Sequence, residues 1–167
     1  MKTICLHGAE STGKTVLAGR LGYPWVAEYG RIYCEERGTD LTMPDLLAIA
    51  EGQAAENRKA AAASPPLLVL DTDQLMTAAW AQMLFSQVPD ALWAYPKADL
   101  YLLFSPDVPW QRDGTRCFGE ETNRARFAEI AEEVLVQAGV PFVRIAGTWE
   151  QREARARQAI AELTAAD

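Results

Sequence analysis

A glycine-rich motif near the start of the chain restricts the fold more than any other feature of the sequence. Residues 8–15 read Gly-Ala-Glu-Ser-Thr-Gly-Lys-Thr and fit G-x-x-x-x-G-K-[ST], the pattern of a phosphate-binding loop. Ile4–Leu6 has the apolar character of a short buried strand, and Val16, Leu17 and Leu21 follow the motif with helical spacing. A strand, this loop and a helix in succession are the context in which the motif binds phosphates, and a chance glycine turn is the alternative. We therefore expect this chain to bind a nucleoside triphosphate.

The fixed residues of the motif each have a defined task in phosphate binding. The glycines let the backbone curl so that consecutive N–H groups point at one anion, and the start of the helix adds its positive dipole. Lys14 is expected to bridge the β- and γ-phosphates, and the hydroxyl of Thr15 to ligate Mg²⁺. The residues expected to contact the nucleotide are Gly8, Glu10, Ser11, Thr12, Gly13, Lys14, Thr15 and Val16.

Composition and charge limit the class of partner. A length of 167 residues is typical of one domain, and a net charge of −7 argues against a nucleic acid backbone as the ligand. Apolar runs fall far short of the ~20 residues of a membrane helix, and the first residues do not resemble a secretory signal. The three cysteines contain no C-x-x-C pair, which favours a reducing, cytoplasmic setting. We expect a small-molecule partner, with no nucleic acid and no membrane, and the oligomeric state stays open.

Apolar runs alternate with helical patterns along the whole chain. This order predicts an α/β fold of the P-loop NTPase type: a five-stranded parallel sheet with helices on both faces. The strands are expected at 4–6, 25–27, 67–70, 98–104 and 142–145. Two capping boxes, at Thr42–Asp45 and Thr148–Gln151, predict helix starts, and Gly139 predicts a helix end. Because parallel strands end at one edge of a sheet, the loops that follow them are expected to meet there.

Two acids follow predicted strands at that edge. Asp71 comes directly after the most apolar strand, where folds of this type place a Mg²⁺-binding carboxylate, although an N-cap is the alternative. Glu28 ends the second strand and could take the proton from an attacking hydroxyl. The alternative for Glu28 is a surface acid paired with Arg31.

Asp73 begins a second group of polar residues. Thr77 and Trp80 follow it at i+4 and i+7, so the three are expected to share one face of a helix at the mouth of the site. An acid, a hydroxyl and an aromatic ring suit a small polar molecule with a flat ring. A core position for Trp80 and a solvent-facing Thr77 are the alternative. Tyr29, beside Glu28, is either a core residue or a ring-stacking one.

A loop rich in arginine, proline and glycine spans about residues 107–120. Arg112 and Arg116 in this loop could close over the triphosphate and stabilise charge in a transition state, and a solvated loop is the alternative. His7, alone in the first strand, is expected to be a core residue without a catalytic role. The whole chain, residues 1–167, is thus expected to form one kinase domain with a lid-like loop.

These motifs together resemble the ribosylnicotinamide kinase domain of the NadR-type NAD-biosynthesis proteins, over nearly the whole length. The resemblance rests on Gly8–Thr15, on Glu28-Tyr29-Gly30-Arg31, on Asp71-Thr72-Asp73 with Thr77, and on Pro109-Trp110 followed by Asp113-Gly114-Thr115-Arg116. It implies phosphorylation of the 5′-hydroxyl of nicotinamide riboside with ATP and Mg²⁺, which gives nicotinamide mononucleotide. It also implies a nucleoside-kinase-like fold with a lid around Pro109–Arg116.

The residues assigned to the acceptor by these arguments are Glu28, Tyr29, Arg31, Asp73, Thr77 and Trp80, and those assigned to catalysis are Lys14, Glu28, Asp73, Arg112 and Arg116. Either Glu28 or Asp73 could be the general base. Two other functions stay open: a kinase for another nucleoside or small alcohol, and a regulatory ATPase that transfers no phosphate to a metabolite. A guanine-specific switch would need an N-K-x-D-type base reader, which the sequence lacks.

Overall fold

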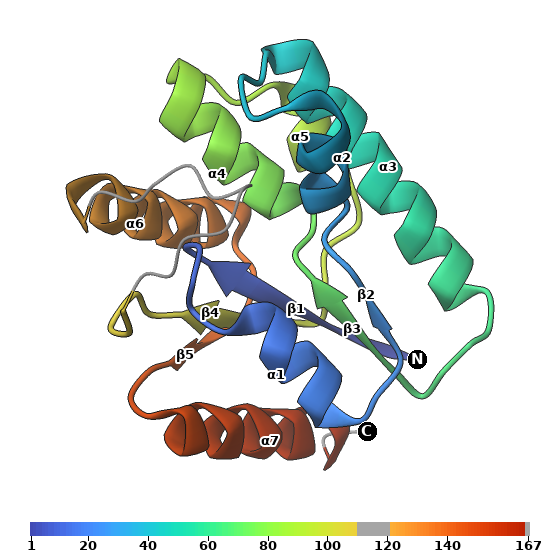
Figure 1. Cartoon of the computed structure of the whole chain (residues 1–167). Coiled ribbons are helices and arrows are strands. Elements are labelled where there is room, and N and C mark those ends of the chain that lie inside the picture. The colour runs from blue at the N-terminus through green and yellow to red at the C-terminus, as the bar shows by residue number, and fades with distance from the viewer. Residues whose placement is uncertain (110–120, 166–167) are drawn as a thin grey trace.

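The sheet has five parallel strands in the order β2-β3-β1-β4-β5 (Figure 1). The computed structural model describes residues 1–109 and 121–165. The strands are β1 (Lys2–Gly8), β2 (Trp25–Val26), β3 (Leu67–Asp71), β4 (Leu100–Phe104) and β5 (Phe142–Ile145). This confirms the predicted five-stranded parallel sheet.

Helices cover both faces of the sheet, as predicted. They are α1 (Lys14–Leu21), α2 (Tyr29–Arg37), α3 (Met43–Ala61), α4 (Gln74–Phe85), α5 (Asp90–Trp93), α6 (Glu121–Ala138) and α7 (Trp149–Ala165). Buried residues of α3, α4 and α6 pack together on one face, and those of α1 and α7 pack on the other. Figure 1 shows the two layers on opposite sides of the strands.

The burial of the central strands explains why continuous apolar runs in the sequence predict the sheet. Every residue of β3 and β4 is buried, because successive side chains point to opposite faces and both faces are covered. In β1, Cys5 belongs to the core under α3, α4 and α6, while Ile4 and Leu6 belong to the core under α1 and α7. The sheet therefore separates two apolar cores.

Capping residues set the helix starts where the sequence predicts them. The side chain of Thr42 accepts a hydrogen bond from Asp45 N, and Asp45 accepts from Thr42 N, which is the reciprocal capping box. Thr148 and Gln151 make the same reciprocal pair before α7.

The segment after β2 differs from the prediction. The strand is only two residues long, Ala27 lies outside it, and Tyr29 begins helix α2. None of the residues of α2 is fully buried, so the helix has no apolar stripe that its sequence could reveal. The short helix α5 was missed for a related reason, since four residues are too few to show a helical period.

The topology creates a crevice at the carboxyl ends of β1 and β3. These two strands are neighbours, but the helix that follows β1 packs on one face and the helix that follows β3 packs on the other. Ligands of open parallel sheets bind at such a point, where the direction of the connections reverses. Among the described residues, no helix is both long and apolar enough to cross a membrane.

Candidate active site

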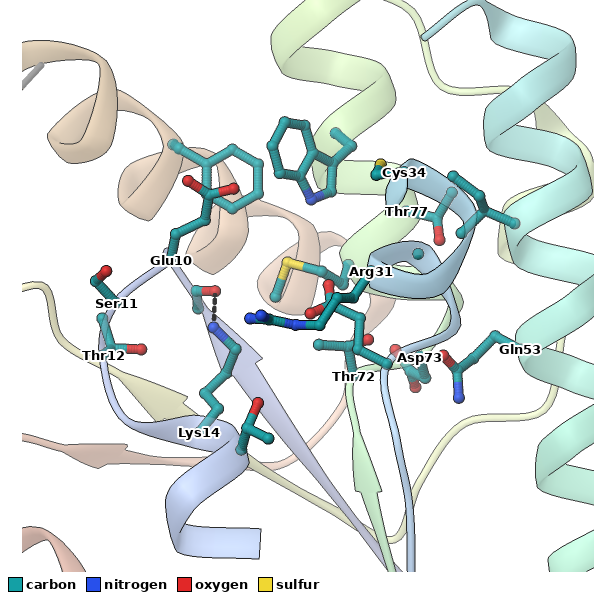
Figure 2. Close-up of a pocket in the computed structure, with 18 of the residues that line it drawn as sticks. Glu10, Ser11, Thr12, Lys14, Arg31, Cys34, Gln53, Thr72, Asp73 and Thr77 are labelled. Atoms are coloured by element: carbon teal, nitrogen blue, oxygen red, sulfur yellow. Dashed lines mark hydrogen bonds between the residues drawn. The ribbon is translucent and has the colours of Figure 1, made fainter. Parts of the chain in front are cut away.

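A cavity of about 400 Å³ lies at this crevice (Figure 2). It runs from the glycine-rich loop after β1 to the side chains of α2, α3, α4 and α6. The lining residues are Gly8, Glu10, Ser11, Thr12, Gly13, Lys14, Thr15, Val16, Glu28, Gly30, Arg31, Cys34, Leu41, Leu46, Ile49, Gln53, Thr72, Asp73, Met76, Thr77, Trp80 and Phe127. All eight residues predicted to contact the nucleotide line this cavity.

The loop after β1 curls around the ammonium group of Lys14. Lys14 Nζ donates to the carbonyl oxygen of Gly8 at 2.9 Å (Figure 2) and to that of Ala9 at 2.7 Å. Gly8 has a φ of +131°, and a Cβ there would lie 2.6 Å from the carbonyl oxygen of Phe104 in β4. The first glycine of the motif is therefore required both by its backbone conformation and by the neighbouring strand.

The second glycine of the motif lies under an aromatic ring. Gly13 has a φ of +86°, and a Cβ there would lie 2.5 Å from the indole of Trp149, the first residue of α7. Trp149 is 51% exposed and does not line the cavity, so its ring covers the outer side of the loop. Contact with the first residue of α7 thus shapes the loop from outside.

Thr15 and Asp71 meet at the carboxyl ends of β1 and β3. The Thr15 hydroxyl donates to Asp71 Oδ2 at 2.5 Å, and Asp71 Oδ1 is buried with no hydrogen-bond partner among the described residues. Burial raises the pKa of the Asp71 carboxyl, which the Thr15 hydrogen bond partly offsets. An orphaned, buried carboxylate oxygen beside a hydroxyl fits a hard cation such as Mg²⁺.

The described residues contain no cluster of three or more histidine, cysteine or acidic side chains that could cage a metal. Mg²⁺ needs no such cluster, because it takes one or two protein ligands and completes its shell with water and substrate phosphates. The donor set of Thr15 and Asp71 therefore fits the ion that the sequence predicts.

Glu28 is the N-cap residue of α2 and lines the middle of the cavity. Loss of surrounding water raises the pKa of its carboxyl to about 7, and the negative charge of Asp71 adds to the rise. Lys14 and Arg31 act in the opposite direction. Glu28 is therefore a carboxyl that exchanges its proton near neutral pH, which is the property of a general base.

Asp73 is not at the mouth of the site as predicted but in its buried wall, with 3% of its surface exposed. Its Oδ2 accepts from the Tyr101 hydroxyl in β4, and its Oδ1 caps α4 by accepting from Leu75 N at 2.9 Å. Burial raises the pKa of Asp73, and these two hydrogen bonds oppose the rise. The N-cap considered for Asp71 is thus made by Asp73.

Thr77 and Trp80 line the cavity together with Asp73, one helical turn apart along α4. Thr77 is 5% exposed, so the solvent-facing alternative is wrong. The Trp80 ring contacts Phe127 of α6 with 4.9 Å between ring centres and 50° between planes. Trp80 is both packed on the core and part of the cavity wall.

Two neighbours of Glu28 have different surroundings. The Arg31 side chain lines the cavity and extends toward Lys14 (Figure 2). Tyr29 is not among the lining residues, because its ring packs against α3, where a Cβ at Gly52 would lie 2.2 Å from it. The structure thus places Tyr29 with the core, one of the two alternatives for this residue.

Gln53, which is 2% exposed and lines the cavity from α3, was not predicted as a site residue. Its Oε1 accepts from Tyr29 N at 2.8 Å, and its Nε2 donates to Ala27 O at 3.2 Å. These bonds fix the backbone on both sides of Glu28. The signal was a single amide on the apolar face of an alanine-rich helix, at the spacing of Leu46 and Ile49.

Two further predictions concern the loop and the histidine. Arg112 and Arg116, with most of the lid-like loop, lie outside the described residues. His7 is fully buried and its Nε2 lies 2.9 Å from Ala131 O. Burial lowers the pKa of His7 to about 3, so the ring is neutral and contributes to the core.

Comparison with known proteins agrees with this geometry. Residues 3–152 match a protein family described as an AAA domain. The chain belongs to this AAA domain family. The domain is also homologous to the trifunctional NAD biosynthesis/regulator protein NadR of Escherichia coli K12, with 29% identity over 158 residues, and to that of Salmonella typhimurium LT2, with 28%. Each alignment covers 87% of this chain and 38% of the relative, so the domain spans about two fifths of these proteins.

Solved structures show the same fold. A NadR protein in complex with NR has a TM-score of 0.78 and 25% identity, covering 98% of this chain and 50% of the other. Deoxyadenosine kinase from M. mycoides covers 96% of this chain and 99% of its own, with a TM-score of 0.71 and 12% identity. Thymidylate kinase from Candida albicans covers 96% and 91%, with a TM-score of 0.70 and 14% identity. The predicted resemblance to NadR and the nucleoside-kinase-like fold are both confirmed for this AAA domain.

Proposed function

We propose that this domain is a kinase that transfers the γ-phosphoryl group of ATP to the 5′-hydroxyl of nicotinamide riboside. The observation that carries the proposal is a cavity with a phosphate-binding loop on one side and acids, a hydroxyl and an aromatic ring on the other. The likeness to a NadR protein solved with NR supports the choice of acceptor. Residues 1–167 would then form one kinase domain, with residues 107–120 as its lid.

The loop side of the cavity is suited to the triphosphate. The backbone N–H groups of residues 8–15 and the dipole of α1 favour an anion, and Lys14 supplies a positive charge within the loop. Thr15 and Asp71 would hold Mg²⁺, which supplies positive charge against the phosphate oxygens when bound. We assign to Arg112 and Arg116 the task of stabilising charge that develops during transfer.

Glu28 is the better candidate for the general base. A new bond forms between the acceptor oxygen and the γ-phosphorus, the bond to the ADP oxygen breaks, and the hydroxyl proton passes to a carboxylate. With a pKa of about 7, Glu28 is partly ionised at neutral pH and becomes neutral on accepting the proton. Asp73 is less suited, because both of its oxygens already accept hydrogen bonds from the protein.

Asp73, Thr77 and Trp80 are instead assigned to acceptor binding. The lone pairs of Asp73 that remain, and the Thr77 hydroxyl, can bind ribose hydroxyls, and the Trp80 ring offers a flat apolar face. Arg31 lies between the loop and the acceptor side, where a cation can contact the transferring group.

The test is product formation from ATP, Mg²⁺ and a panel of nucleosides, with nicotinamide riboside included. We expect one phosphoester per ATP consumed with nicotinamide riboside and little ATP loss without an acceptor. Phosphorylation of another nucleoside would keep the kinase and change the acceptor. ATP hydrolysis that is independent of the panel would indicate a regulatory ATPase and refute the kinase.

A further inference from the structure

Two buried arginines bind the outer side of the phosphate-binding loop. Arg124, from α6, is 7% exposed, and Arg152, from α7, is 2% exposed. Neither side chain lines the cavity. Buried arginine is rare because desolvation of its charge is costly, so two of them against one loop require an explanation.

Arg124 binds two consecutive carbonyl groups of the loop. Its Nε donates to Glu10 O at 3.2 Å, and its Nη2 donates to Ser11 O at 3.1 Å. Its Nη1 donates to Val108 O at 2.7 Å, in the segment that follows β4. All three nitrogens of the guanidinium are therefore used by backbone carbonyls.

Arg152 binds the next carbonyl of the loop. Its Nη1 donates to Thr12 O at 3.1 Å, and its Nε donates to Gly147 O at 2.9 Å. Its Nη2 donates to Ser105 O at 2.9 Å and forms an ion pair with Asp107. The two arginines thus hold three successive loop carbonyls and connect them to the segment after β4.

The consequence for phosphate binding follows from the peptide plane. In a trans peptide, the carbonyl of one residue and the N–H of the next point in opposite directions. A carbonyl held by an arginine outside the loop therefore turns the following N–H toward the inside. Fixing the carbonyls of Glu10, Ser11 and Thr12 orients the N–H groups of Ser11, Thr12 and Gly13, which belong to residues that line the cavity.

We propose that Arg124 and Arg152 are positioning residues that hold these three peptide planes with their N–H groups turned toward the phosphates. The proposal rests on the proposed function, because it assumes that the loop binds a polyphosphate. It requires the planar guanidinium and not only its charge, since a lysine has one nitrogen and cannot bind separate carbonyls in a fixed plane. An arrangement set before the ligand arrives needs no reorganisation when it binds.

The test compares Arg124→Lys and Arg152→Lys with Arg157→Lys. Arg157 is the matched control, because it also binds backbone carbonyls, but those of Arg20 and Leu21 at the end of α1 and not those of the loop. The probes are inorganic tripolyphosphate, which needs only the loop, and ATP with Mg²⁺. Thermal unfolding without ligand shows whether each variant is folded.

We expect the Arg124 and Arg152 variants to bind tripolyphosphate and ATP roughly 10- to 100-fold more weakly and to leave the Michaelis constant for the acceptor unchanged. The Arg157 variant should match the wild type in its affinity for tripolyphosphate and ATP and in its Michaelis constant for the acceptor. Folded variants of Arg124 and Arg152 with wild-type tripolyphosphate affinity would overturn the proposal, as would equal losses toward ATP and acceptor. If the wild type bound no tripolyphosphate or ATP, the proposed function itself would fail.

A measurement on the wild type covers the case in which the variants do not fold. The Nε–H groups of Arg124 and Arg152 are buried and bonded, so their NMR signals should exchange slowly with solvent and shift when tripolyphosphate binds. Exchange as fast as that of exposed Arg126, or no shift on binding, would refute the positioning role.

Discussion

Glu28 should lower the stability of the folded protein at neutral and higher pH, where its carboxyl is ionised and can act as the base. Loss of water and the nearby charge of Asp71 raise the pKa of Glu28 from 4.5 to about 7. A carboxyl with a raised pKa favours the folded state while protonated, and this advantage is lost as the pH rises from 4.5 through 7. At about 1.4 kcal/mol for each pH unit between 4.5 and 7, the full loss has an upper limit of about 3.5 kcal/mol.

Glu28→Gln removes the ionisable group and keeps the size of the side chain. The free energy of unfolding of the variant, relative to the wild type, should therefore be higher at pH 8 than at pH 5 by up to about 3.5 kcal/mol. Urea unfolding at the two pH values measures this difference. Glu36→Gln, an exposed acid on the same helix, is the control and should give no comparable change. An equal effect of Glu28→Gln at both pH values would refute the raised pKa.

The same substitution should remove the pH dependence of turnover. A base with a pKa of about 7 is about one-tenth ionised at pH 6, so the wild-type rate should fall roughly tenfold from its plateau at that pH. The Glu28→Gln variant should turn over slowly at every pH and should not show this fall in rate at low pH. If the turnover rate of the variant still fell below about pH 7, the base would be another group.

Four other predictions concern the remaining residues of the site. Lys14→Ala should abolish phosphoryl transfer and keep the fold, and unchanged activity would contradict the assignment of the loop. Asp71→Asn should reduce turnover roughly 10²-fold and weaken the response to Mg²⁺, which a metal titration measures. Asp73→Asn should mainly raise the Michaelis constant of the acceptor and cost about 1–3 kcal/mol in urea unfolding, because a buried donor loses its acceptor. Arg112→Ala and Arg116→Ala should each lower turnover more than ATP affinity, and an effect on the Michaelis constant for ATP alone would make the loop a binding clamp.

The sheet and the loop could be predicted from the sequence because both depend on patterns of neighbouring residues. Buried parallel strands are continuous apolar runs, and the glycine motif contains its own backbone requirements. Helix α2 could not be predicted in this way, because it buries no side chain completely and so lacks a helical period in its apolar residues.

The positions of the site residues depend on contacts that are distant in the sequence. Asp73 lies in the wall of the cavity because Tyr101, 28 residues later, donates to it from β4. The Tyr29 ring packs against α3 because Gly52, which has no side chain, leaves space for it. Arg152 binds the carbonyl oxygen of Thr12, which lies 140 residues earlier in the sequence. No local sequence pattern indicates that this arginine is buried against the loop and not exposed on the surface. Residue types therefore predicted which chemistry is present, and packing decided where each group lies.

Two of the five tryptophans of the sequence lie beside opposite ends of the cavity and can serve as natural fluorophores. Trp149 covers the outer side of the phosphate-binding loop at Gly13, while Trp80 lies in the opposite wall of the cavity beside Phe127. Indole emission responds to the polarity of its immediate surroundings, so Trp80 would respond to a ligand in the cavity beside it and Trp149 to a change in the phosphate-binding loop. A variant that keeps Trp80 or Trp149 as its one tryptophan, with the other four replaced, would follow one of these two regions alone. The order in which two ligands arrive could thus be recorded optically, with no label attached to either.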